Sequence, residues 1–495
     1  MSDSGGAGGR TFAVVGGGIS GLAAAWRLVQ RDPSATVIVF EASERLGGKL
    51  HSVQADGFLM EAGPDAFLSA KPRGIGLARE LGLEPQFQSP DPATRGSFVL
   101  RRGKLHPLPE GLTGLIPTRL EPMAQTSLIS PLGKVRMALD FAIPARQDDA
   151  DESLHAFLSR RLGREPFENL IEPLMAGIYA GDAKQLSVEA TFPQLRRAER
   201  EHGGVIKGVI AARRQAEAAK TAAPDATAPL PAFTSFTTGT ETLIRALETR
   251  LQAAGAGIRR SSPVTAVRPA ASDGGRQRWR VIAGDGMAET VVDGVIFASP
   301  AWATAPILAT LDADAGAALG EIPHVSTALI MLGFPLSQLP DPRRLHGHGY
   351  VVPRTEGRAI MAMSWLSSKW RNRAPAGMAL LRGFAGRAGQ EAVYARSDDE
   401  LILAMRNEVR DVLGFTVDPV LTHVYRYENA MPQYTLGHLD RVRRVDAGID
   451  RLPGVAIAGN ALRGVGIPDA IREGERAADA VLAATPSEVR NFALP

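Results

Sequence analysis

The chain has 495 residues, of which 44% are hydrophobic and 22% charged, so it can bury a large core and form two or three domains. Its formal net charge of +3 permits an acidic substrate or an anionic membrane surface and does not call for nucleic acid. It contains no cysteine, which excludes disulfides, iron–sulfur clusters, zinc–thiolate sites and catalytic thiols.

Membrane-spanning and secretory segments are not evident. No window approaches the roughly 18 uninterrupted apolar residues of a spanning helix, and residues 1–10 lack the apolar centre of a secretory signal. We therefore expect a cytoplasmic protein that could contact the inner face of the cell membrane peripherally.

Residues 11–41 carry the first strong motif and predict a strand, a tight turn, a helix and a second strand. The turn comprises Gly16, Gly17, Gly18, Ile19, Ser20 and Gly21, with G-x-G-x-x-G spacing. In this pattern Gly16 allows the sharp turn, Gly18 lets a pyrophosphate approach the backbone, and Gly21 lets the helix pack closely. Glu41 ends the second strand where a ribose hydroxyl needs an acceptor. These features predict a dinucleotide site.

The residues after Glu41 favour FAD over NAD. Arg45, Gly48 and Lys49 follow the acid directly, where a simple dehydrogenase would continue with another helix. Glycines next to cations let the backbone run along a long cofactor and present N–H groups and positive charge to it. This arrangement resembles the flavin amine oxidase superfamily.

Further along the chain, alternating strands and helices predict an α/β fold, α+β overall, with a discontinuous Rossmann-like FAD domain. A sheet-based substrate domain and an inserted, mainly helical domain that could face a membrane complete the architecture. We predict FAD-binding parts at 1–84, 231–304 and 431–495, the helical insertion at 85–230, and the substrate sheet at 305–430.

Four stretches together resemble the oxygen-dependent protoporphyrinogen oxidases: residues 15–23, 63–68, 177–193, and 431–438 with 459–460 and 464–467. The resemblance implies oxidation of protoporphyrinogen IX to protoporphyrin IX by FAD in three two-electron steps, with O₂ reoxidising the flavin to give hydrogen peroxide. It leaves open the closely similar coproporphyrinogen III oxidases, and other flavin oxidases that act on amines or polyenes. A non-catalytic nucleotide-binding protein and an NAD-dependent dehydrogenase are the remaining alternatives.

The resemblance also implies cofactor contacts beyond the first motif. We expect these from Gly63, Pro64, Asp65 and Ala66 across the flavin, Val264 beside the adenine, Tyr427 near the flavin, and Gly459, Val465, Gly466 and Ile467 on the pyrimidine side.

On the substrate side, relatives usually carry an arginine directly before the position of Phe98, where it pairs with a propionate, but this chain has Ser97 there. Arg95 is the candidate substitute. We expect Gly177 to let the flat macrocycle lie close, and Tyr350, Met361 and Met363 to line an apolar pocket. We assign no catalytic side chain, because the flavin performs the redox chemistry, and we expect no metal. A homodimer stays open.

Overall fold

Three distant parts of the chain build one parallel sheet. The computed structural model describes residues 9–113, 115–222, 231–273, 276–284 and 288–486. Its five-stranded parallel sheet has the order β12-β2-β1-β16-β22. The strands are β1 (Thr11–Val15), β2 (Thr36–Phe40), β12 (Gly257–Arg259), β16 (Gly294–Phe297) and β22 (Val455–Ile457). The start, the middle and the end of the chain therefore all contribute.

The sheet is apolar on both faces because both are covered. In β1, Phe12 and Val14 join one buried cluster, while Ala13 and Val15 join another. The first face packs against α1 (Ile19–Arg31), α2 (Pro72–Glu80), α11 (Thr242–Ala253) and α18 (Ile467–Ala484). The second packs against α12 (Ala301–Ala309), α13 (Ala313–Gly320), α17 (His438–Ile449) and a three-stranded antiparallel sheet of β13 (Val264–Asp273), β14 (Arg276–Ala283) and β15 (Ala288–Val292).

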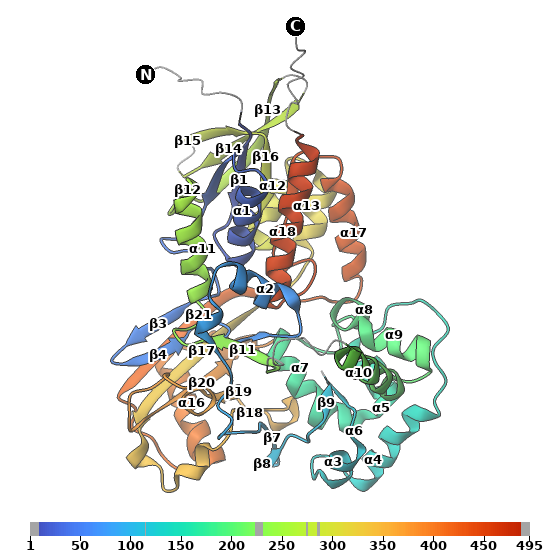
Figure 1. Ribbon diagram of the computed structural model, residues 1–495. Coiled ribbons are helices and arrows are strands. Elements are labelled where there is room, and N and C mark those ends of the chain that lie inside the picture. Colours follow the sequence, from blue (N-terminus) through green and yellow to red (C-terminus); the bar gives the residue numbers. More distant parts are fainter. Residues whose placement is uncertain (1–8, 114, 223–230, 274–275, 285–287, 487–495) are drawn as a thin grey trace.

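A seven-stranded sheet with the order β21-β17-β20-β19-β18-β7-β8 forms the other main layer, below the parallel sheet in Figure 1. Its strands are β7 (Phe98–Arg101), β8 (Lys104–Pro107), β17 (His324–Pro335), β18 (Gly349–Val351), β19 (Ile360–Trp365), β20 (Met378–Ala385) and β21 (Leu421–Pro432). Helix α16 (Asp398–Glu408), continued by η7 (Val409–Leu413), packs its apolar side on one face. The sheet thus takes two strands from before residue 305.

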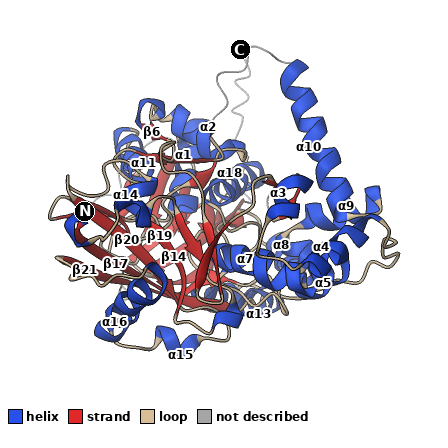
Figure 2. Cartoon of the chain, turned by 90° about the horizontal axis from the view of Figure 1, so that it is seen from below, coloured by secondary structure: helices blue, strands red, loops and turns tan. Residues whose placement is uncertain are grey.

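The helical part lies beside the strands, as both views show (Figures 1 and 2). It comprises α3 (Leu120–Gln125), α4 (Pro131–Ala138), η2 (Leu139–Phe141), α5 (Leu154–Leu162), α6 (Arg164–Pro166), η3 (Phe167–Ile171), α7 (Glu172–Tyr179), α8 (Val188–Thr191), α9 (Pro193–His202) and α10 (Val205–Ala222). These helices share one apolar core. Within the described ranges, no helix is long and apolar enough to cross a membrane.

Short elements connect these layers. They are β3 (Ser52–Ala55) with β4 (Phe58–Glu61), β5 (Phe67–Leu68), η1 (Glu84–Gln86), β6 (Phe87–Gln88) and β11 (Phe233–Phe236), β9 (Leu112–Thr113) with β10 (Ile116–Pro117), η4 (Leu336–Gln338), η5 (Pro342–Leu345), η6 (Arg354–Glu356), α14 (Leu366–Lys369) and α15 (Glu391–Tyr394).

Candidate cofactor and substrate site

The turn between β1 and α1 has the geometry of a pyrophosphate cradle. Gly16 has φ +110°, donates its N–H to the Phe40 carbonyl at 2.7 Å, and has no room for a side chain against residues 298 and 299. A Cβ at Gly21 would run into the Gly16 carbonyl, whereas a Cβ at Gly18 would meet nothing within 4 Å. The backbone before α1 is therefore open, and the helix N-terminus offers its free N–H groups and partial positive charge there.

The two other residues of this turn anchor the helix. Ile19, the first residue of α1, is buried in the core. Ser20 is also buried, and its hydroxyl donates to the Ala470 carbonyl at 2.8 Å. These side chains are occupied by packing, so the backbone of this turn is what remains for a ligand.

Glu41 lies at the end of β2 and holds its own surroundings in place. Its carboxylate accepts the Gly17 N–H at 2.7 Å, and the N–H and hydroxyl of Ser43 at 2.8 and 2.7 Å. The Ser262 N–H donates to the Glu41 carbonyl at 2.8 Å, which brings the start of β13, with Val264, close to this acid. Glu41 and Val264 thus lie where a ribose and its adenine would be expected.

The segment after Glu41 runs beside the glycine turn. Gly18 forms a bridge with Gly47, and a Cβ at Gly48, which has φ +56°, would lie 3.5 Å from the Gly18 Cα. Arg45 folds back and donates to the carbonyls of Leu46, at 3.1 Å, and Gly48. Two backbone segments therefore face each other with only glycines between them.

The Lys49 ammonium is largely enclosed by the protein. No hydrogen bond or ion pair to its ammonium occurs among the residues described, and burial lowers its pKa to about 8. Its carbonyl lies where a Cβ at Gly63 would have to go. An ammonium in such a position is stabilised by an anionic or polar ligand group.

The predicted flavin-crossing segment is tied to the seven-stranded sheet. Asp65 accepts hydrogen bonds from Lys369 Nζ at 2.8 Å and Trp370 Nε1 at 2.7 Å, and pairs with Arg382 at 3.0 Å. Burial alone would raise the pKa of Asp65, but the cations of Lys369 and Arg382 hold it well below its usual range. The Pro64 carbonyl accepts the Thr240 hydroxyl at 3.0 Å, and Ala66 packs against a small apolar cluster.

The loop after β22 provides a second open backbone. Gly459 has φ +111°, and a Cβ there would meet nothing within 4 Å. Gly466 precedes α18, which begins at the buried Ile467, and Val465 packs against the core of the helical part. Tyr427 is half-buried on β21 and lies near the cations of Arg45 and Arg382. Burial raises its pKa, and these two positive charges oppose the rise without cancelling it.

Gly177 presents a bare surface on the substrate side. It is exposed within α7, and a Cβ there would meet nothing within 4 Å. Nearby, Ala180, Val325 and Met361 form a small apolar cluster with Phe384 and Met431. A flat apolar ligand could lie against such a surface.

The chain matches the profile of a protein family described as "Flavin containing amine oxidoreductase" over residues 19–482. It belongs to this family. Among curated relatives, the coproporphyrinogen III oxidase of Bacillus subtilis is 35% identical over 94% of this chain and 96% of its own length. Human protoporphyrinogen oxidase is 32% identical over 97% of this chain and 100% of its own length. A crystal structure of a putative protoporphyrinogen oxidase from Exiguobacterium aligns with a TM-score of 0.82 and 32% identity, covering 96% of this chain and 99% of that one.

This flavin amine oxidoreductase is therefore an FAD-dependent oxidoreductase enzyme. The residues present fit the cofactor, because the glycine turn, the Gly48 backbone and the Gly459 loop leave open backbone where an extended ligand would lie. The glycine turn would hold the pyrophosphate, Glu41 the ribose, and Lys49 with the loop after β22 the flavin end. When bound, FAD supplies the two-electron acceptor.

Two expected substrate residues lie elsewhere. Tyr350 is buried, and its hydroxyl donates to Glu408 of α16 at 3.1 Å. Met363 belongs to the same core between the sheet and α16. Both are therefore on the far side from Ala180 and Met361, and we leave them out of the proposed site.

Arg95 lies on an exposed loop, and no ion pair or hydrogen bond to its side chain occurs in the described part of the chain. Its loop is held by the Thr94 hydroxyl, which donates to the Ser368 carbonyl at 2.5 Å, and by the Gly96 carbonyl, which accepts the His348 N–H at 2.8 Å. The guanidinium is thus free to meet an anion at the edge of the sheet.

The sequence analysis did not identify two arginines near the site, Arg382, which is buried, and Arg354, which is partly buried. Arg382 interrupts the apolar strand β20, and this charge within an otherwise apolar run was a readable signal. Arg354 pairs with the buried Glu172 at 3.0 Å and donates to the Gly181 carbonyl at 2.8 Å, so it fixes both ends of α7. Nothing in the local sequence indicates that second contact.

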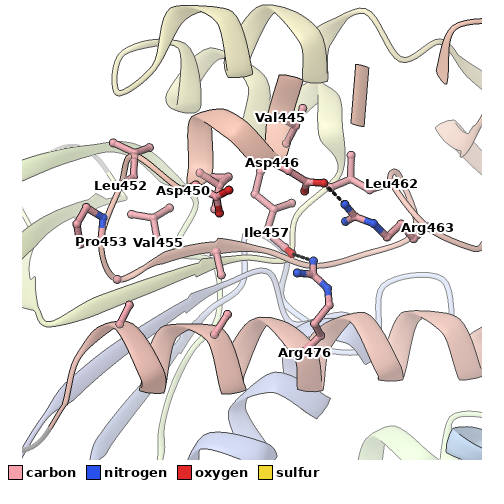
Figure 3. A pocket seen from close by; sticks show the side chains of 15 residues that line it. Val445, Asp446, Asp450, Leu452, Pro453, Val455, Ile457, Leu462, Arg463 and Arg476 are labelled. Carbon is pink, nitrogen blue, oxygen red and sulfur yellow. Dashed lines mark hydrogen bonds and ion pairs between the residues drawn. The ribbon is translucent and has the colours of Figure 1, made fainter. Parts of the chain in front are cut away.

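A cavity of about 520 Å³ lies away from the glycine turn, between α17 and α18 beside the edge strand β22 (Figure 3). Asp446 and Arg463 form an ion pair on its wall, and Arg476 donates to the Ile457 carbonyl at 3.2 Å. Because Leu462 and Arg463 follow β22, the cavity lies behind the loop that carries Gly459.

Proposed function

We propose that this enzyme oxidises a porphyrinogen in heme biosynthesis, converting protoporphyrinogen IX to protoporphyrin IX with O₂ as acceptor and hydrogen peroxide as product. Similarity over nearly the whole chain to oxidases named for porphyrinogens carries the proposal. In each of three two-electron steps a meso C–H bond breaks as hydride leaves for the cofactor, and one proton is lost. Over the three steps two of these protons come from pyrrole N–H groups, and the third comes from a meso carbon by tautomerism of the macrocycle. The exposed Gly177 surface allows the macrocycle to approach closely.

Coproporphyrinogen III is the second candidate substrate. The relatives at 34–35% identity are named for it, whereas those named for protoporphyrinogen are 30–32% identical. A substrate with more propionates would have more use for Arg95, whose side chain has no ion pair or hydrogen bond within the described residues. We assign no protein general base, and the proton passes to solvent or moves by tautomerism of the substrate.

The test is anaerobic mixing of the purified flavoprotein with each porphyrinogen while the flavin absorbance is followed. Bleaching by protoporphyrinogen IX, with porphyrin fluorescence after air is admitted, supports the leading assignment. Faster bleaching by coproporphyrinogen III assigns the enzyme to the second substrate. No bleaching by either contradicts a porphyrinogen oxidase and directs the search to amines and polyenes.

We further propose peripheral contact of the helical part with anionic lipid at the inner face of the cytoplasmic membrane. The apolar residues expected to make this contact, near 107–131, include the buried Leu115, Ile116 and Leu128. Exposed apolar side chains occur instead at Leu132 and Val135 of α4. Leu139 and Phe141 continue this surface, and Lys207 lies over the Phe141 ring. An apolar stripe bordered by a cation suits an anionic interface.

A flotation assay with anionic vesicles tests this contact. Leu132→Glu should abolish co-flotation at low salt, whereas Leu403→Glu, at an exposed leucine of α16, should not. Equal flotation of both variants, or failure of the unmodified protein to float, contradicts the proposal. Homodimer formation stays a prediction that light scattering checks.

A further inference from the structure

The segment of residues 431–438, here called the clasp segment, touches two parts of the site at once. Its sequence Met-Pro-Gln-Tyr-Thr-Leu-Gly-His stood out in the sequence, but none of the functions assigned above uses it. It connects the end of β21 to the start of α17. Its side chains Gln433, Tyr434 and His438 are all buried.

Tyr434 and His438 hold the loop after β22. The Tyr434 hydroxyl donates to the Asn460 carbonyl at 2.6 Å, and His438 Nε2 lies 2.9 Å from the Leu462 carbonyl. The two rings stack with centroids 4.1 Å apart and planes 17° apart. Burial raises the pKa of Tyr434 well above its ordinary value and lowers that of His438 to about 4, so both are neutral donors at physiological pH.

These two bonds add to the other contacts of the loop, which include the ion pair of Arg463 with Asp446 and the burial of Leu462 in the core behind the parallel sheet. Residues 458–466 form neither helix nor strand, and the cavity beside β22 lies behind Leu462 and Arg463 (Figure 3). Where packing is incomplete, hydrogen bonds to backbone carbonyls decide which conformation the loop keeps. Gly459, at the start of this loop, carries the open backbone described above.

The same segment holds the substrate surface from the other side. Gln433 Nε2 donates to the Tyr179 carbonyl at 2.8 Å, at the end of α7, and the space beside Gly181 is filled by the Gln433 amide. The Ser187 N–H donates to the Tyr434 carbonyl at 2.8 Å, and the Leu436 N–H to the Gln185 carbonyl at 2.9 Å. The adjacent residues Gln433 and Tyr434 thus bond to the end of α7, which carries the exposed Gly177, and to the loop after β22.

We propose that the clasp segment sets the position of the porphyrinogen surface relative to the flavin, with Tyr434 and His438 fixing the cofactor loop and Gln433 fixing the end of α7. All three are positioning residues, since none is placed against the reacting atoms. The proposal rests on the proposed assignment of residues 459–467 to the flavin. If the loop also adopts conformations that cannot bind FAD, the apparent affinity for FAD falls in proportion to the fraction of molecules that keep the binding-competent conformation.

The first test follows FAD release from the diluted holoenzyme by the recovery of flavin fluorescence. Tyr434→Phe keeps the ring stack but removes one bond, and we expect FAD release about tenfold faster. Tyr394→Phe is the control, because no hydrogen bond of that hydroxyl occurs in the described residues. Unchanged release from Tyr434→Phe overturns the proposal, as does equally accelerated release from Tyr394→Phe.

A second pair of variants covers the case in which Tyr434→Phe fails to fold. His438→Gln can place an amide N–H near the position of Nε2 and should release FAD at nearly the original rate, whereas His438→Leu should release it faster. Equal rates for the two variants contradict the role given to His438.

Gln433→Met should act differently from both. It leaves the loop bonds intact, so FAD release should stay unchanged while the KM for the porphyrinogen rises several-fold at constant kcat. Faster FAD release from this variant contradicts the division of roles. If Glu41→Ala weakens FAD binding but the Tyr434 and His438 variants do not, the cofactor assignment stands and the clasp proposal falls.

Discussion

Arg382 Nη1 donates a hydrogen bond to the carbonyl oxygen of Gly63 at 2.7 Å, across the junction between the seven-stranded sheet and the segment after β4. The same nitrogen donates to the Glu61 carbonyl at 3.1 Å, and Nη2 pairs with Asp65. One buried guanidinium therefore fixes three successive points of the segment expected to cross the flavin. The two layers of the molecule meet through this cation.

Asp65→Asn should destabilise the protein by about 3 kcal/mol or more, because it leaves the buried Arg382 and the partly buried Lys369 without their carboxylate. Urea unfolding measures the change. Asp91→Asn is the control, since Asp91 forms an ion pair with the exposed Arg371 and the loss of this pair should cost less than about 1 kcal/mol. Equal midpoints for the two variants would contradict this account.

Glu41→Ala should weaken FAD binding by about tenfold to a hundredfold, because it removes the ribose acceptor and frees the Gly17 N–H that the carboxylate now holds. Equilibrium titration of FAD fluorescence gives the affinity. Glu44→Ala serves as control, since Glu44 is exposed and no ion pair of its side chain occurs in the described residues. An equally large loss of FAD affinity in Glu44→Ala would show that removal of a negative charge, rather than loss of the ribose acceptor, causes the effect.

Gly177→Val should raise the KM for the porphyrinogen at least about tenfold without loss of FAD, because the side chain would occupy a surface where a Cβ meets nothing within 4 Å. Steady-state kinetics and the flavin content of the purified variant measure both effects. A variant that retains its KM would move the substrate away from this wall.

Arg95→Ala should raise the KM about fivefold to fiftyfold, since a charge-assisted bond to a propionate contributes about 1 to 2.5 kcal/mol. The exposed Arg102 provides the control, because its side chain extends from the β7–β8 turn. If both substitutions change the KM equally, the propionate contact lies elsewhere on the protein.

Acid should destabilise the protein through His438. Burial lowers its pKa to about 4 from the ordinary 6.5, so between these values the unfolded chain binds a proton that the folded chain does not. Stability is therefore fully present above pH 6.5 and falls as the pH drops toward 4, by on the order of 3 kcal/mol. The urea midpoint should depend less on pH across this range in His438→Gln than in the unmodified protein. An unchanged pH dependence would assign the effect to other groups.

The dinucleotide half was predictable from sequence because its signals are local. The first strand, the helix after the glycine turn and the second strand form as expected, as β1, α1 and β2. Propensity and capping fix such elements within a few residues. The expected domain boundaries and the individual cofactor contacts stay predictions.

The substrate half was less predictable because both faces of its sheet are apolar. In β19 the sequence Ile-Met-Ala-Met-Ser-Trp does not show which face is buried against which neighbour. A register shift between Ile360 and Ala362 then places Met361 and Met363 in different clusters, although a spacing of two predicts one face. The charge of Arg382 within an apolar strand is a local signal, but nothing in the sequence indicates that its partner is Asp65.

The packing of α18 against α1 has a consequence for biosynthesis. Gly474 of α18 lies so close to the Ser20 carbonyl that a side chain would not fit, and β22 completes the sheet that β1 begins. At roughly 5 to 20 residues per second, the ribosome needs roughly 20 to 90 s to make the final helix after the first strand has emerged. During that interval the nascent dinucleotide half lacks β22 and α18, so apolar residues of β1 and α1 stay uncovered until the end of the chain is made.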